Sequence, residues 1–283
     1  MPMRAIAYNE VVTRVAELCK KAAYELPSDV HAALESAHGS ENAPLGRSIL
    51  RHCLDNAAIA SRERMPICQD TGFAVYFVEM GAEVFIEGGL LADAVAEGTA
   101  RGYTDGYLRK SIVADPLFDR KNTRDNTPPI VHLSIVPGDR LRLILAPKGG
   151  GSENMSAVAM LKPADGQQGV IDFIVETVVK AGGNPCPPTI VGVGIGGTFE
   201  MVTLLAKRAL LRKVGEPNPD KRYAALEREI LDRINASGVG PQGLGGTTTA
   251  FAVHINTYPC HIASLPVAVN LNCHAARHAE VVM

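Results

Sequence analysis

The spacing of apolar residues predicts helices at the start of the chain. A stripe with a period of 3.6 residues, typical of an amphipathic helix, is formed by Val11, Val15, Leu18, Cys19 and Ala22. A second helix is expected over residues 48–64. It should end before Pro66, because proline cannot continue a helix. Residues 1 to about 65 are therefore expected to form a helical region.

From Cys68 onward, short β-like runs alternate with helical stretches. Strands are expected at 74–78, 84–86, 130–136, 140–146, 189–193, 250–256 and 266–271, and helices at 90–101, 169–181, 199–213 and 223–236. This interleaving predicts an α/β fold, with a mixed sheet flanked by helices and a helical N-terminal region. We expect a single domain over residues 1–283, and no tandem repeat is evident.

Composition and charge exclude several classes of protein. With 46% hydrophobic and 20% charged residues and a net charge of −2, the chain is neither disordered nor fibrous, and no basic surface for nucleic acid or membrane is expected. The N-terminus shows no apolar signal region and no run of about 20 apolar residues occurs, so we expect a cytoplasmic protein with no membrane contact. Six cysteines without a CxxC pair favour metal binding or catalysis over a disulfide scaffold.

Four clusters could carry chemistry. Residues 66–72, PICQDTG, combine a thiol, an amide and a carboxylate, although an ordinary polar turn would look similar. Residues 147–155, PKGGGSENM, are typical of a backbone cradle for an anion, or otherwise of a flexible linker. Residues 184–188, NPCPP, enclose a cysteine between prolines, and residues 258–278 contain YPCH and NCHAARH.

Two patterns typical of nucleotide-binding sites are not supported by the sequence around them. Residues 192–197 match G-x-G-x-x-G, but a proline-rich loop beginning near Glu216 stands where a dinucleotide fold needs its next strand and acidic residue. Lys148 precedes its glycines, so a Walker-type phosphate loop is not supported.

If Cys68, Cys186 and Cys273 converge, three thiolates favour an iron–sulfur cluster with one open iron over a closed zinc site. The other cysteines, Cys19, Cys53 and Cys260, are expected to serve packing.

Taken in order, five motifs resemble the iron–sulfur (class I) fumarate hydratases, and specifically the alpha subunit of their two-subunit form, with the tartrate dehydratase alpha subunit as a related neighbour. They are CQDTG, KGGGSEN, NPCPPTIVGVGIGG, GPQGLGGTTTAFAVHI and NCHAARH. The resemblance covers nearly the whole chain. It implies a hydro-lyase that interconverts fumarate and (S)-malate, a small dicarboxylate substrate and a [4Fe–4S] cluster.

The resemblance also implies roles for particular residues. The cluster ligands would be Cys68, Cys186 and Cys273. Acid–base work would involve Asp70, at the departing hydroxyl, and the active-site histidine His261. Arg109 is placed like an arginine that pairs with a substrate carboxylate, a task that suits its fork of donors. The substrate contacts implied are Gln69, Asp70, Arg109, Gly150, Gly151, Ser152, Asn154 and His261.

The single-chain members of the family continue into a second domain, which supplies further arginines, a lysine and a threonine base, whereas this sequence ends shortly after Cys273. We therefore expect a separate beta subunit, an active site completed at the interface and an α2β2 assembly. The tartrate branch has a cysteine after the triple glycine, where Ser152 stands here, which favours fumarate. Alternatives are a tartrate dehydratase or mesaconase, an iron–sulfur sensor or electron-transfer module without substrate chemistry, and a non-catalytic scaffold subunit.

Overall fold

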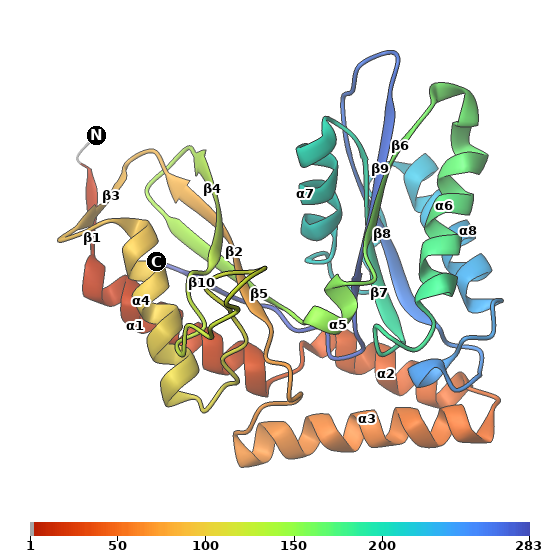
Figure 1. Cartoon of the computed structure of the whole chain (residues 1–283), viewed down its shortest axis with the longest axis horizontal. Helices are drawn as coiled ribbons and strands as arrows, with labels where there is room; N and C mark the ends of the chain where they lie inside the picture. Colours follow the sequence, from red (N-terminus) through yellow and green to blue (C-terminus); the bar gives the residue numbers. More distant parts are fainter. Residues whose placement is uncertain (1–2) are drawn as a thin grey trace. The chain divides into compact units, whose positions relative to one another are not determined.

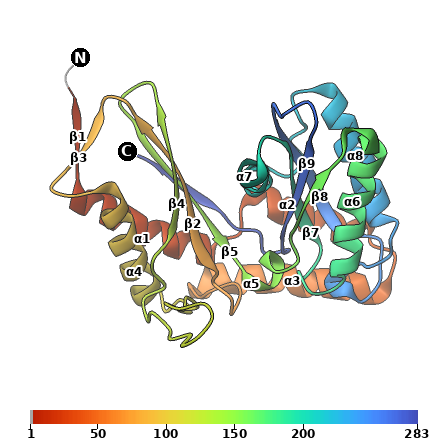
Figure 2. The ribbon, with the colours of Figure 1, turned by 45° about the horizontal axis from the view of Figure 1, so that its top comes forward.

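The computed structural model describes residues 3–283, which its internal contacts divide into two compact units (Figures 1 and 2). Unit 1 contains the chain up to Pro27, Ala57–Gly150 and Arg277–Met283, and unit 2 contains Ser28–Asn56 and Gly151–Ala276. Each unit has a mixed sheet flanked by helices, which confirms the expected α/β class. Because the chain passes between the units more than once, neither is one continuous segment, and the single domain over residues 1–283 stays a prediction.

The N-terminal region is helical, as expected. Its helices are α1 (Tyr8–Tyr24), α2 (Ser28–Ser40) and α3 (Pro44–Glu63). The apolar stripe predicted from the sequence is the buried face of α1, with Val11 and Val15 fully covered. The short strand β1 (Arg4–Ala7) precedes these helices and pairs in parallel with β3 (Val84–Glu87), a pairing that the sequence did not reveal.

Unit 1 is built on a four-stranded sheet with the order β10-β5-β2-β4. Its strands are β2 (Phe73–Gly81), β4 (Ile130–Val136), β5 (Leu141–Lys148) and β10 (Ala279–Val282), and its second helix is α4 (Leu91–Asp105). The central strand β2 is parallel to β4 and antiparallel to β5. Apolar side chains of β2 and β5 form one core with α1 and α4, including the fully buried Tyr76, Leu143 and Leu145.

Unit 2 has a four-stranded sheet with the order β6-β9-β7-β8. Its strands are β6 (Ala157–Leu161), β7 (Thr189–Gly196), β8 (Ala250–Tyr258) and β9 (Leu265–Asn272). Its helices are α6 (Gly166–Ala181), α7 (Phe199–Ala209) and α8 (Lys221–Asn235), with the one-turn α5 (Gly150–Glu153) at its start and 3₁₀ turns at Pro163–Asp165 and Pro241–Gly243. Figure 1 shows α6 and α8 on one face of this sheet and α7 on the other.

The two sheets share one connection pattern. In each sheet, the central strand (β2 or β7) is followed, after a helical segment, by a parallel neighbour (β4 or β8). The next strand (β5 or β9) pairs antiparallel with the other side of the central strand. The candidate motifs occupy corresponding places, because CQDTG and NPCPP precede the central strands and KGGG and NCHAARH follow the antiparallel ones. The connection pattern is therefore repeated although the sequence shows no repeat.

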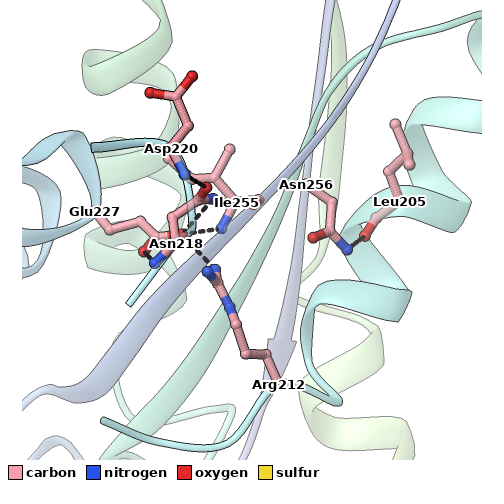
Figure 3. Close-up of polar contacts among 7 residues, drawn as sticks. All are labelled: Leu205, Arg212, Asn218, Asp220, Glu227, Ile255 and Asn256. Atoms are coloured by element: carbon pink, nitrogen blue, oxygen red, sulfur yellow. Dashed lines mark hydrogen bonds and ion pairs between the residues drawn. The ribbon is translucent and has the colours of Figure 1, made fainter. Parts of the chain in front are cut away.

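A buried ion pair stabilises unit 2 beside β8. The Glu227 carboxylate is paired with the Arg212 guanidinium and accepts hydrogen bonds from the backbone N–H of Ile255 at 2.7 Å and of Asn218 at 3.2 Å (Figure 3). The same segment caps α8, since the Asp220 side chain accepts the Arg222 N–H at 2.8 Å.

None of the helices over residues 3–283 is both long and apolar enough to cross a membrane.

Candidate active site

The CQDTG motif is a tight polar turn that leads into β2. The Asp70 N–H points at the Cys68 sulfur at 3.4 Å, and the Gly72 N–H donates to Asp70 Oδ1 at 3.0 Å. The Cys68 thiol itself contacts Gln69 Oε1 at 3.4 Å. Gly72 adopts a φ of +82°, and a Cβ there would lie 2.8 Å from the Lys148 backbone nitrogen, so only glycine fits. The polar turn considered from the sequence is present, and it also presents the functional groups.

Asp70 joins two motifs that lie far apart in the sequence. Its Oδ2 atom accepts the backbone N–H of Gly150 at 2.7 Å, so the carboxylate fixes the start of the glycine-rich turn after β5. Two backbone donors hold this side chain, and a carboxylate with about four acceptor sites still has capacity for a further partner. The glycines are therefore part of an ordered turn in which Asp70 is the anchor, not a linker.

Arg109 reaches the same region through its backbone. Its carbonyl accepts the Thr71 hydroxyl at 3.0 Å, while the Arg109 side chain is exposed. Below this contact, the buried Tyr103 hydroxyl lies 3.0 Å from the carbonyls of both Thr71 and Gly72. Burial raises the pKa of Tyr103, so the hydroxyl stays a donor at all ordinary pH values. Unit 1 thus brings together Cys68, Gln69, Asp70, Arg109 and Gly150.

Unit 2 brings together Cys186 and Cys273. The residue after Cys273, His274, donates its backbone N–H to the Cys186 carbonyl at 3.1 Å, which fixes the NPCPP loop to the end of β9. Cys186 has a φ of +55°, a left-handed conformation that a non-glycine residue adopts at a cost and that surrounding contacts must hold. Cys186 is exposed and Cys273 partly exposed, so both sulfur atoms belong to accessible loops.

Gln242 bridges the two cysteine loops. Its backbone N–H and its side-chain amide both donate to the Pro187 carbonyl, at 2.8 and 2.9 Å, and the amide nitrogen also lies 3.1 Å from His274 Nδ1. His274 Nδ1 also lies 3.0 Å from the Cys186 carbonyl oxygen, so the imidazole contacts both the NPCPP loop and Gln242. These contacts together fix the position of the His274 ring.

A buried carboxylate anchors the loop that carries Gln242. Glu41, at the end of α2, is fully buried and accepts the backbone N–H groups of Thr247 at 2.9 Å and Thr248 at 3.1 Å. It also accepts the Ala43 N–H at 3.0 Å. These backbone hydrogen bonds lower the pKa of Glu41 against the opposing effect of burial. A charge buried in this way must be satisfied by many donors, and here they are loop amides.

The residues after the glycines are held within unit 2. A Cβ on Gly151 would lie 3.4 Å from the Asn184 carbonyl, so this glycine sits beside the NPCPP loop. The Glu153 carboxylate pairs with Lys207 of α7 at 2.5 Å and accepts the Asn270 amide at 2.8 Å. Ser152 is buried and Asn154 is exposed. Thus Gly151, Ser152 and Asn154 lie on a segment that passes beside the NPCPP loop and is hydrogen-bonded through Glu153 to β9, the strand that ends just before Cys273.

Cys53 is a third thiol in this part of unit 2. It lies on α3, and its pKa is raised to about 11, mainly by burial and further by the charges of Cys273 and Cys186. Cys53 is partly exposed, and its expected role in packing stays a prediction.

His261 lies at the opposite end of the unit 2 sheet. It occupies the exposed turn between β8 and β9, beyond the point where Tyr258 pairs with Gly196 at the end of β7. Cys186 precedes the start of β7, so His261 is roughly 25 Å from it at about 3.3 Å per residue along the strand. His261 instead lines a cavity of about 490 Å³ with Arg222 and Tyr223. Its catalytic role stays a prediction.

The glycines of the GVGIGG segment serve packing. A Cβ on Gly192 or Gly194 would lie 2.2 or 2.1 Å from backbone carbonyls of α7. These residues are inside β7, and their missing side chains let α7 lie directly on the sheet. This accounts for the G-x-G pattern without a dinucleotide.

The donor chemistry fits an iron–sulfur group in part. All six cysteines are thiols, and Cys186 and Cys273 offer two soft sulfur donors from loops fixed to each other. Among residues 3–283, no three His, Cys, Asp or Glu side chains are arranged to close around a metal ion. The participation of Cys68, which belongs to unit 1, rests on the resemblance.

Several residues of these networks were not singled out from the sequence. Gln242 and His274 lie inside recognised motifs, but their neighbours in sequence give no sign of which residue bridges two loops. Glu41 carries no signal for its role as an anchor, because the loop amides that it holds are more than 200 residues away.

Comparison with known proteins gives a consistent result. The family model described as fumarate hydratase (Fumerase) matches residues 12–282. A Methanocaldococcus jannaschii protein with the provisional name L(+)-tartrate dehydratase subunit alpha is 42% identical over 94% of this chain and 94% of its own. Proteins named L(+)-tartrate dehydratase subunit alpha from Escherichia coli strains UTI89 and K12 are 34% and 32% identical, over 97% and 98% of this chain and 91% and 92% of theirs.

Proposed function

Because the chain belongs to the fumarate hydratase (Fumerase) family, we propose that it is the alpha-type subunit of a two-subunit hydro-lyase that hydrates fumarate reversibly to (S)-malate. L(+)-tartrate is the second candidate substrate, favoured by the names of the relatives. Both reactions interconvert a four-carbon hydroxy dicarboxylate and its dehydrated form, by removal or addition of a hydroxyl group and a proton. The alpha designation of the relatives supports a beta subunit, and we propose an α2β2 assembly.

One observation carries the proposal: motifs far apart in the sequence meet within each unit. Asp70 holds Gly150 in unit 1, and His274 holds the Cys186 carbonyl in unit 2. A structural role alone would not require a carboxylate with spare acceptor sites beside a glycine-rich turn, nor two accessible cysteine loops fixed to each other. We propose that Cys68, Cys186 and Cys273 hold a [4Fe–4S] cluster.

The cluster, when bound, would supply a Lewis-acidic open iron for the hydroxyl group that leaves or is added. The chain's own residues would bind and orient the substrate. Arg109 offers a fork of donors to one carboxylate, and Gly150 and Gly151, which have no side chains, would let the substrate approach the backbone closely. Asp70 would hold the proton that accompanies the hydroxyl, and Gln69, Ser152 and Asn154 would contact the substrate. The base that removes the carbon-bound proton would come from the partner subunit.

The test is an anaerobic assay of this chain with and without its beta partner. We expect fumarate hydration, L(+)-tartrate dehydration or mesaconate hydration by the complex, together with iron–sulfur absorbance. Cys186→Ala should abolish both, whereas Cys260→Ala, an exposed thiol at the other end of the sheet, should change neither. Absorbance and reversible redox cycling without turnover would indicate a sensor, and binding of the partner without iron would indicate a scaffold.

A further inference from the structure

Arg277 is a buried cation with two unused hydrogen-bond donors. It lies between β9 and β10, and only 4% of the residue is exposed. Its Nη2 atom donates to the Asp70 carbonyl oxygen. Its Nε and Nη1 atoms, also buried, find no acceptor within residues 3–283. Buried donors of a charged group are seldom left unpaired, so an acceptor from outside the chain is expected there.

The guanidinium geometry limits what that acceptor can be. Nη2 carries two protons, one on the edge that it shares with Nε and one on the edge that it shares with Nη1. Since one of these protons is used for Asp70, the opposite edge keeps a two-donor fork. Such a fork matches the two oxygens of a carboxylate and adds charge attraction that a neutral water lacks.

The surroundings place this fork at the candidate site. The carbonyl that Arg277 holds belongs to Asp70, whose carboxylate anchors Gly150. The charges of Arg277 and Asp70 both reach Tyr103, the hydroxyl of which supports the CQDTG turn from below. Arg277 meets Asp70 at the backbone carbonyl, and its Nε and Nη1 atoms have no acceptor among the described residues, so the free edge of the guanidinium is left for an anion.

We propose that Arg277 is an additional substrate-binding residue, the free guanidinium edge of which grips one carboxylate of the dicarboxylate substrate beside Asp70. This inference rests on the proposed function and adds a residue that none of the earlier assignments included. An inorganic anion or a water at the same edge is the rival occupant. The two are distinguished by whether binding of a dicarboxylate depends on the guanidinium.

The experiment uses the complex of the full chain with its beta partner. KM and kcat for fumarate and L(+)-tartrate, and the inhibition constant of the unreactive dicarboxylate succinate, are measured for wild type, Arg277→Lys and Arg277→Gln. We expect KM and the succinate constant to rise roughly tenfold or more in Arg277→Gln and by less in Arg277→Lys, with a smaller change in kcat. The control Arg101→Gln removes an exposed guanidinium on α4 of the same unit and should leave all constants unchanged.

Constants within about twofold of wild type in a folded Arg277 variant would overturn the inference, because water or an inorganic anion then occupies the edge. If both variants fail to fold, a crystal structure of the wild-type complex grown with succinate decides. A carboxylate on Arg277 Nε or Nη1 supports the proposal, and succinate elsewhere, or only water at those atoms, overturns it. A wild-type complex that neither turns over nor binds any dicarboxylate would instead contradict the proposed function.

Discussion

Replacing Glu41 by glutamine tests whether a buried charge holds the loop of residues 240–249. Glu41 Oε1 accepts N–H groups from Ala43 and Thr247, both at 3.0 Å, and Oε2 accepts from Thr247 at 2.9 Å and Thr248 at 3.1 Å. Glutamine has the same shape but carries an NH₂ group at one of these positions. At least one backbone N–H would then face another donor in a buried site.

The expected magnitude follows from these contacts. A hydrogen bond to a charged acceptor contributes about 1.5–3 kcal/mol, and a buried donor left unsatisfied costs a similar amount. We therefore expect Glu41→Gln to lower the free energy of unfolding by about 2–4 kcal/mol. The lowered pKa of Glu41 also means that its contribution is present above the unfolded value of 4.5 and is lost as pH falls below it.

The assay is urea unfolding of the full chain followed by circular dichroism, with hydrogen exchange of residues 242–249 as a local readout. Glu35→Gln is the matched control, because Glu35 lies on α2, which ends just before Glu41, and its side chain is 63% exposed. Amide exchange in the loop should accelerate in Glu41→Gln only. If Glu41→Gln is as stable as Glu35→Gln and the loop amides stay protected, the reasoning about the buried carboxylate is refuted.

Three further predictions concern single residues. Asp70→Asn should lower turnover by about 10²–10⁴, because the amide cannot move the proton. Initial rates check this, with circular dichroism to show that the variant is folded, and a full rate would contradict it. Gln242→Leu removes the bridge between the cysteine loops. It should lower the amount of iron retained after anaerobic reconstitution and speed hydrogen exchange of the His274 amide. Unchanged iron content and exchange rate would contradict the bridge. Burial lowers the pKa of His254 to about 4. Between pH 7.5 and 5 the histidine therefore takes up a proton in the unfolded chain but stays neutral in the folded chain. The free energy of unfolding of the wild type should fall by roughly 2 kcal/mol over this range. Urea unfolding at both pH values tests this, and His254→Gln should remove that part of the pH dependence.

Long elements and local motifs could be predicted from the sequence. The stripe of Val11 and Val15 identified α1, and the apolar runs identified β2 and β7, because burial of one helix face or of a central strand leaves a clear pattern. The short strands β1 and β10 were not predicted. Four residues at the margin of a sheet carry too little pattern, and their pairing depends on partners far away in the chain.

The candidate site was predicted in its residue types but not in its supporting contacts. The motifs CQDTG and NPCPP indicate a functional site because their composition is unusual. Glu41 and Gln242, in contrast, bind backbone amides and carbonyls, which every residue has, so the sequence does not show which ones they contact. His261 shows the opposite difficulty. Its position before Cys273 matches the family pattern, but a β-hairpin turn lies a whole strand length from the end at which Cys273 stands, so nearness in sequence does not bring the two together.

The repeated connection pattern of the two sheets separates the scaffold from the chemistry. Both units carry their candidate residues in loops at matching strand ends. The contents of those loops differ, since unit 1 carries Cys68, Asp70 and Arg277 and unit 2 carries Cys186 and Cys273. Strand pairing depends on the backbone, so the same sheet order holds while the loops are free to specialise.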